Sequence, residues 1–123
     1  MSKTDTSHHD EQIANMAFGS VYPHHLSRLI KNGRTKEEYN QVITWLTGYD
    51  DAQIQSHIDN KTNYKDFFEA AQLHPNANMI TGVVCGYRIE GITNDTTRNC
   101  RYLDKLVDEL ARGRKMEKIL RTA

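Results

Sequence analysis

The sequence predicts an all-α protein, a compact single domain built from five or six short helices. Its 123 residues suffice for one domain of ordinary size and leave no room for two domains with separate cores. Apolar residues recur at intervals of three and four along successive segments, which is the spacing of one helix face. Helix-capping residues and glycines bound most of these segments.

Residues 1–12 are polar and aperiodic, so we expect a disordered tail ahead of a helical domain over residues 13–123. The tail contains His8 and His9, with no cysteine or third histidine nearby in the sequence, and we predict no metal site there.

The first expected helix begins with Pro23 in its first turn, where a missing N–H costs nothing. Leu26, Leu29 and Ile30 form its apolar face. Asn32-Gly33 marks its end, because glycine readily adopts the left-handed conformation found there.

The second expected helix has the clearest start, since Thr35 and Glu38 are spaced as a capping box. One apolar stripe follows, and Gly48 ends the helix. The stripe consists of Tyr39, Val42, Ile43 and Leu46.

Two shorter helices are expected next. Asp50 or Asp51 caps the first, which carries Ile54 and Ile58, and Asn63 caps the second. The second presents a bulky apolar face made of Tyr64, Phe67, Phe68 and Ala71.

Residues 79–92 suit either a helix or a strand. The β-branched residues favour a buried strand, whereas Gly82 and Gly86, four positions apart, favour a helix that a neighbour approaches closely. We favour a helix over residues 79–89, because no partner strand is evident elsewhere.

The last long helix starts at Asn94 or Asp95 and stops at Gly113. Its apolar face consists of Leu103, Leu106, Val107 and Leu110. After Gly113, Met116, Ile119 and Leu120 make a short amphipathic segment. This segment predicts either a homodimer, with the segment docked on a second copy, or closure of the chain's own core.

Charge is distributed unevenly, although the formal net charge is zero. Residues 35–97 carry a net charge of −5, and residues 98–123 carry +4. Overall neutrality argues against a protein that coats nucleic acid or anionic membranes. No apolar run approaches the roughly 20 residues of a membrane helix. Without an apolar signal segment or a disulfide framework, the chain is expected in the cytoplasm.

Five blocks of the sequence carry a resemblance to known proteins: Ser20–Pro23, Gly33–Glu38, Trp45–Asp50, Ile80–Gly86 and Arg101–Ala111. Read together, they resemble the domain-of-unknown-function 2200 family of small bacterial proteins, from about Ala17 to Arg121. The resemblance implies a compact, mainly helical bacterial domain, and it implies no activity because the family is uncharacterised. Residues 94–97 depart from the Asp-Pro-Leu-like turn expected in the family, which leaves the start of the last helix open.

One candidate anion-binding site consists of Arg34, Thr35 and Lys36, which place two cations at a helix start where free amides favour an anion. Glu38 already supplies a negative charge there. Cys85 and Cys100 are expected in packing or surface positions, although Arg101 next to Cys100 would favour a thiolate. The sequence contains no phosphate-binding glycine loop, and we predict no cofactor. It supports no pairing of either cysteine with a histidine, and we predict no catalytic residue.

These observations favour a protein-interaction or accessory domain with no assignable chemistry, and they leave open whether it is an enzyme. The alternative is a small enzyme or ligand binder. Its pocket would gather polar and aromatic residues that helix packing does not explain, namely Tyr22, Trp45, Tyr49, Arg88 and Arg101. A second alternative is weak nucleic-acid binding through residues 98–121, which mix both charge signs and offer only Tyr102 for base stacking.

Overall fold

The computed structural model describes residues 7–121 and confirms the predicted all-α class. The helices are α1 (Ser7–Asn15), α2 (Phe18–Lys31), α3 (Lys36–Thr47), α4 (Asp51–Asp59), α5 (Tyr64–Glu69), α6 (Asp95–Ala111) and α7 (Met116–Ile119). Two short strands, β1 (Val83–Val84) and β2 (Tyr87–Arg88), lie between the 3-10 helices η1 (Ala77–Met79) and η2 (Ile89–Gly91).

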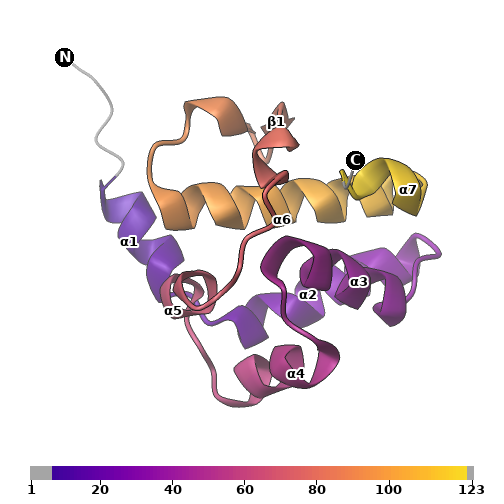
Figure 1. Cartoon of the computed structure of the whole chain (residues 1–123), viewed down its shortest axis with the longest axis horizontal. Helices are drawn as coiled ribbons and strands as arrows, with labels where there is room; N and C mark the ends of the chain where they lie inside the picture. Colours follow the sequence, from indigo (N-terminus) through magenta and orange to yellow (C-terminus); the bar gives the residue numbers. More distant parts are fainter. Residues whose placement is uncertain (1–6, 122–123) are drawn as a thin grey trace.

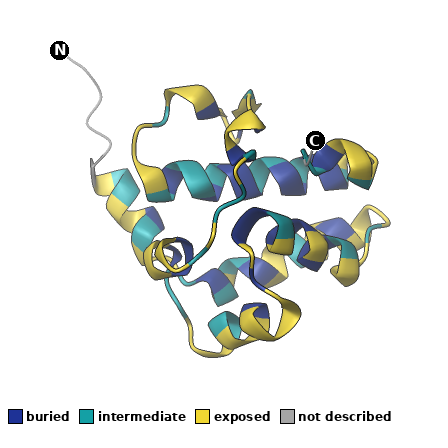
Figure 2. Ribbon diagram, in the orientation of Figure 1, coloured by how far each residue is buried: buried dark blue, intermediate teal, exposed yellow. Residues whose placement is uncertain are grey.

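The helix α6 runs along the length of the molecule and is the element on which most others pack (Figure 1). In this view α2 and α3 lie on one side of α6 and the hairpin lies on the other. The helices α1 and α5 contact α6 near its N-terminal end, and α7 contacts it at its C-terminal end. Figure 2 shows buried and exposed residues interleaved along the helices, as expected when each helix turns one face to a shared core.

Aromatic side chains fill the part of the core between α2, α3 and α5. Phe18 stacks on Phe67 with ring centroids 4.1 Å apart, and Tyr64 stacks on Phe68 at 5.6 Å. The predicted stripe of α3 is buried as expected, and Leu46 at its centre has an exposed fraction of 0%. This region is therefore stabilised by the removal of large apolar surfaces from water.

Side-chain caps predicted from the sequence start four of the helices. The Thr35 hydroxyl accepts from the Glu38 amide, while the Glu38 carboxylate accepts from the Thr35 amide, which completes the capping box of α3. Asp50 caps α4 and Asn63 caps α5. Asn94 caps α6, accepting from the Thr97 amide, so the departure from the family pattern at this turn still starts a helix.

The start predicted for the first helix was wrong, because α2 begins at Phe18 and contains Pro23 in its interior. Contacts with residues distant in the sequence stabilise the start of α2 at Phe18. The Phe18 amide donates to the Thr62 carbonyl at 2.8 Å, and the Tyr64 amide donates to the Met16 carbonyl at 2.8 Å. Tertiary hydrogen bonds and the Phe18–Phe67 stack thus outweigh the cost of a proline inside the helix.

Gly19 allows α2 to approach α4 closely. A Cβ atom built at this position would lie 2.9 Å from the backbone oxygen of Ile58, closer than a carbon atom can pack. A side chain here would therefore push the two helices apart.

Part of the expected N-terminal tail is helical. Residues 7–12 belong to α1, whereas residues 1–6 lie outside the described part of the chain. Ile13 of α1 is buried, and the Thr97 hydroxyl of α6 donates to the Asp10 carboxylate at 2.7 Å. These contacts with α6 are not visible in a local hydrophobic pattern, which is why sequence analysis missed the helix.

The helix favoured over residues 79–89 was also wrong, because this segment forms the β1–β2 hairpin between two 3-10 helices. Val84 pairs with Tyr87, which leaves a two-residue turn at Cys85-Gly86. Both turn residues have positive φ values, 53° and 81°, as a type I′ hairpin turn requires. Gly86 therefore serves the turn rather than a close helix contact.

The segment after Gly113 closes the chain's own core. Ile119 is completely buried, and Met116 and Leu120 pack against the same core. The segment is therefore used within one chain, while Met116 and Leu120 stay half-buried. Among the helices formed by residues 7–121, none has the length and apolar character required to cross a membrane.

Candidate functional site

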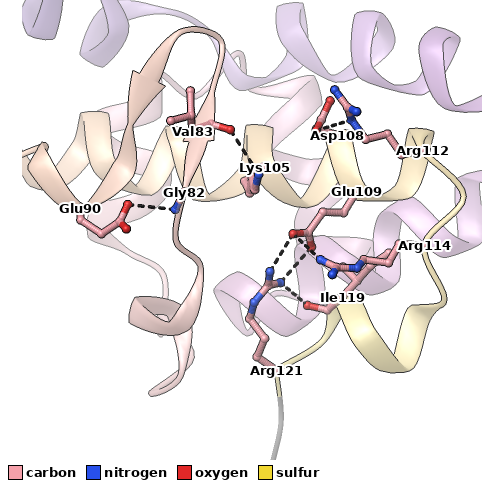
Figure 3. A network of polar contacts seen from close by, with 10 residues as sticks. All are labelled: Gly82, Val83, Glu90, Lys105, Asp108, Glu109, Arg112, Arg114, Ile119 and Arg121. Atoms are coloured by element: carbon pink, nitrogen blue, oxygen red, sulfur yellow. Dashed lines mark hydrogen bonds and ion pairs between the residues drawn. The ribbon is translucent and has the colours of Figure 1, made fainter.

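An open cleft of about 520 Å³ lies beside the C-terminal half of α6, next to the hairpin. Its lining residues are Val83, Lys105, Asp108, Glu109, Arg112, Gly113 and Arg114. Figure 3 shows that most of their charged groups take part in polar contacts. We refer to this feature as the basic cleft.

Glu109 is a nearly buried carboxylate that binds two arginines. Arg121 donates to both of its oxygens, at 3.0 Å and 2.8 Å, and Arg114 donates to Oε2 at 3.0 Å (Figure 3). Because α6 supplies the carboxylate and the segment around α7 supplies both cations, these bonds fasten that segment to α6. Arg34 adds a further connection, donating from Nη1 to the Arg114 carbonyl at 3.0 Å.

Asp108 also binds two arginines, one from α2 and one that directly follows α6. Arg28 of α2 donates to its Oδ1 and Arg112 donates to its Oδ2, each at 2.9 Å. Burial alone would raise the pKa of Asp108, but the hydrogen bonds from the two arginines outweigh burial and lower it. The carboxylate therefore stays charged and connects α2 to α6.

Lys105 joins the hairpin to α6, because its ammonium donates to the Val83 carbonyl at 3.2 Å (Figure 3). On the other side of this junction the Glu90 carboxylate accepts from the Gly82 amide at 2.9 Å. This backbone hydrogen bond is the main cause of the lowered pKa of Glu90, with smaller contributions from Arg88 and Lys105. Both contacts hold β1 at the rim of the basic cleft, where Val83 is 47% exposed.

Cations outnumber carboxylates around the basic cleft. Its lining provides three cations, from Lys105, Arg112 and Arg114, and Arg28 and Arg121 bind the carboxylates as well. Asp108 and Glu109 are the two carboxylates of the lining. The side chains of Arg112 and Arg114 remain 76% and 52% exposed while paired, so they can still contact an anion from outside.

The sequence profile of a family described as "Uncharacterized protein conserved in bacteria (DUF2200)" matches residues 12–121. The chain belongs to this family. The crystal structure of the uncharacterized protein SP1917 is similar to the DUF2200 fold seen here, with 34% sequence identity and a TM-score of 0.83. The similarity covers 97% of this chain and 94% of that chain. No protein with a curated description matches the sequence.

The five residues expected to share a pocket in this DUF2200 protein are not gathered in one. Tyr22 is buried and donates to Asn40 at 2.6 Å, and it lines a small pocket at the start of α3 and α4. Tyr49 is buried and donates to the Phe67 carbonyl at 2.6 Å. Trp45 stacks on His74 at 4.3 Å, in a separate groove.

The two predicted arginines lie elsewhere again. Arg88 is exposed on β2, with its guanidinium 3.9 Å from the Glu90 carboxylate. Arg101 lies over the Tyr87 ring at 4.4 Å and donates to Asp104 at 3.0 Å. Asp104 also contacts His25 at 3.3 Å. Arg101 thus has a structural explanation, since it connects the hairpin to α6.

The candidate anion site at Arg34, Thr35 and Lys36 contains an internal anion. Glu38 accepts from the Thr35 amide at 3.0 Å and pairs with Arg34 at 3.0 Å. Its carboxylate thus holds the position at which an external anion would meet the start of α3.

The thiolate considered for Cys100 is not favoured, because burial raises the pKa of this thiol to about 12. The effect of burial exceeds the opposing effect of Arg101. Among residues 7–121, no group of three or more His, Cys, Asp or Glu side chains is arranged to hold a metal ion.

Sequence reasoning missed the basic cleft as a site, although it found the basic segment that forms it. The net charge of +4 over residues 98–123 was the available signal. The sequence did not show which arginine pairs with which carboxylate, because partners such as Arg28 and Asp108 are 80 positions apart.

Proposed function

We propose that this protein is an interaction domain whose basic cleft binds an acidic segment of a partner protein. The observation that carries the proposal is the excess of cations around Asp108 and Glu109. Each carboxylate is already shared by two arginines, so an additional carboxylate from outside would meet a net positive field.

The shape and composition of the cleft favour a polypeptide partner over a nucleic acid. The exposed Val83 at the rim offers an apolar contact beside the cations, which suits a segment that combines acidic and apolar residues. No aromatic side chain lines the basic cleft, so nucleic-acid bases would have no ring to stack on.

The test is a fluorescence anisotropy titration with a short labelled peptide of alternating Glu and Leu. We expect binding that weakens as salt is added, because screening acts on exposed charges. Lys105→Gln combined with Arg112→Gln should weaken binding by about tenfold or more, since charged hydrogen bonds contribute about 1.5–3 kcal/mol each. Lys31→Gln combined with Lys65→Gln removes the same charge away from the cleft and should leave affinity nearly unchanged.

Two outcomes would contradict the proposal. One is equal weakening by both double variants, which would indicate a non-specific charge effect. The other is tighter binding of a single-stranded oligonucleotide than of the peptide under the same salt conditions, which would favour the nucleic-acid alternative.

A second copy of the chain is one partner that carries the required charge, because residues 35–97 have a net charge of −5. We propose a homodimer in which this acidic region meets the basic cleft. Sedimentation equilibrium at low and high salt tests it, and a dimer that dissociates with salt and with Lys105→Gln/Arg112→Gln is expected. A monomer at all salt concentrations would exclude the homodimer but not a different acidic partner.

We also propose that the protein works in the cytoplasm. Both cysteines are free thiols, and Cys85 is exposed at the hairpin turn, which suits a reducing compartment. A membrane-impermeant maleimide should leave Cys85 unmodified in intact bacteria and modify it after lysis, while buried Cys100 stays unmodified in the folded protein. Labelling of Cys85 in intact cells would contradict the proposal.

A further inference from the structure

A second pocket, of about 270 Å³, lies at the adjoining starts of α3 and α4, away from the basic cleft. It is lined by Tyr22, Lys36, Glu37, Asn40, Asp51, Ile54 and Gln55. We refer to it as the Asn40 pocket. Its volume suits a small ligand, because a water molecule in the liquid takes up about 30 Å³ and the pocket therefore has room for roughly nine such units.

Asn40 brings an unused donor to this pocket. The residue is only 9% exposed, and its side-chain oxygen accepts from the Tyr22 hydroxyl at 2.6 Å. Its amide nitrogen donates to no group in the described chain. Because Asn40 lines the pocket and its nitrogen keeps access to solvent, this nitrogen is free to donate to the carbonyl oxygen of a ligand.

Two carboxylates make the same pocket acidic. Glu37 and Asp51 form no ion pair among residues 7–121, and neither does Lys36, which leaves the charged lining with a net negative charge. Both carboxylates act on the Tyr22 hydroxyl. Burial is the main cause of its raised pKa, and Asp51 and Glu37 raise it further. Both carboxylates line the same pocket as Tyr22, whose hydroxyl donates to Asn40.

From these groups we infer that the Asn40 pocket binds a small organic cation that carries a carbonyl oxygen beside its ammonium group. The carbonyl oxygen accepts from the Asn40 amide, and the ammonium group lies between Glu37 and Asp51. This arrangement occurs in amino-acid amides and at the free N-terminus of a peptide. A ligand with only one of the two groups leaves either the donor or the carboxylates unpaired.

The experiment follows the side-chain amide signals of Asn40 by NMR while glycinamide is added to the full chain. We expect saturable movement of these signals at millimolar concentrations, the range available to a ligand with so few atoms. Acetamide lacks the ammonium group and ethylammonium lacks the carbonyl. Each should bind about tenfold more weakly or worse, since a charge-assisted hydrogen bond is lost in one case and a neutral one is left unmade in the other.

Matched variants locate the site. Glu37→Gln combined with Asp51→Asn should weaken glycinamide binding by about tenfold or more. Asp66→Asn removes an equally exposed carboxylate from the first turn of α5, outside the pocket, and should leave affinity unchanged. Asn40→Asp keeps an acceptor for the Tyr22 hydroxyl while it removes the amide donors, and it should abolish discrimination between glycinamide and ethylammonium. Thermal melts of each variant confirm that it folds.

Triglycine amide with a free and with an acetylated N-terminus distinguishes the two sources of the ligand. Tighter binding of the free peptide than of glycinamide would assign the pocket to polypeptide N-termini, and the reverse order would assign it to a free metabolite. Unmoved Asn40 signals, or equal affinity in the Glu37→Gln/Asp51→Asn variant, would overturn the inference. None of these results affects the proposal for the basic cleft, which Lys105 and Arg112 test separately.

Discussion

Phe67 and Glu109 are both buried, but they have different kinds of neighbours. Rings of Phe18, Tyr49, Tyr64 and Phe68 surround Phe67, at centroid distances of 4.1–6.4 Å. Guanidinium groups surround Glu109 instead. The rings around Phe67 contact one another inside the core. At the ion-paired end of α6, the side chains of Arg112 and Arg114 are paired and still exposed to solvent. We therefore expect the first region to contribute most of the stability, and the second is where the proposed acidic partner would bind.

The strongest test of the aromatic region is Phe67→Ala. It should destabilise the fold by about 3–5 kcal/mol, because it leaves a cavity among packed rings. Urea unfolding at low and high salt measures the loss, which should be the same at both. A marked salt dependence would show that charge also stabilises this region.

Glu109→Gln tests the ion-paired end, and we expect a loss of about 2–3 kcal/mol. The neutral amide cannot compensate Arg114 and Arg121. The loss stays below that of a completely buried pair because the Arg114 side chain is 52% exposed. High salt should reduce the loss, in contrast to Phe67→Ala. Glu117→Gln, at an exposed position of α7, should change stability by less than about 0.5 kcal/mol. A similar effect of both variants would contradict the role of Glu109.

Gly19→Ala should cost about 1–3 kcal/mol, because the new Cβ would meet the Ile58 backbone oxygen. Alanine normally stabilises a helix relative to glycine, so the expected sign is reversed here. Gly91→Ala is the matched control, since a Cβ at Gly91 meets nothing within 4 Å. Thermal unfolding measures both changes. A gain in stability from Gly19→Ala would mean that α2 and α4 can separate at little cost.

The smallest expected effect concerns pH in the aromatic region. His57 packs on Tyr49 and Phe67, and burial lowers its pKa. The unfolded chain binds a proton near pH 6.5, above the pKa of the folded chain. Stability should therefore fall as pH drops below about 6.5, and this contribution should level off below the folded pKa. His57→Gln should flatten this part of the stability–pH curve. An unchanged slope would show that other groups cause it.

Local signals in the sequence predicted much of this fold. The capping box at Thr35 and Glu38 and the cap at Asn94 depend on residues three positions apart, and both were found. The start of α2 and the helix α1 depend on partners far along the chain, such as Thr62 for Phe18 and Thr97 for Asp10. Periodicity carries no information about such partners, so those boundaries were missed.

The same distinction applies to the candidate sites. Charge counting found the basic segment, because counting requires no knowledge of contacts. It could not show that Arg28 joins Asp108, or that Tyr22 and Asn40 meet beside Asp51. Trp45, Tyr49 and Arg88 were predicted to share a pocket only because they are aromatic or basic. The fold places them in different surroundings.

The central position of α6 affects how the protein is made. The helices α1, α2, α3 and α5 all contact α6, but they precede it in the sequence and leave the ribosome first (Figure 1). Until α6 emerges, the apolar faces that these helices turn toward it have no partner, and exposed apolar surface in a nascent chain promotes aggregation. The core therefore cannot be completed until synthesis has passed residue 111, where α6 ends.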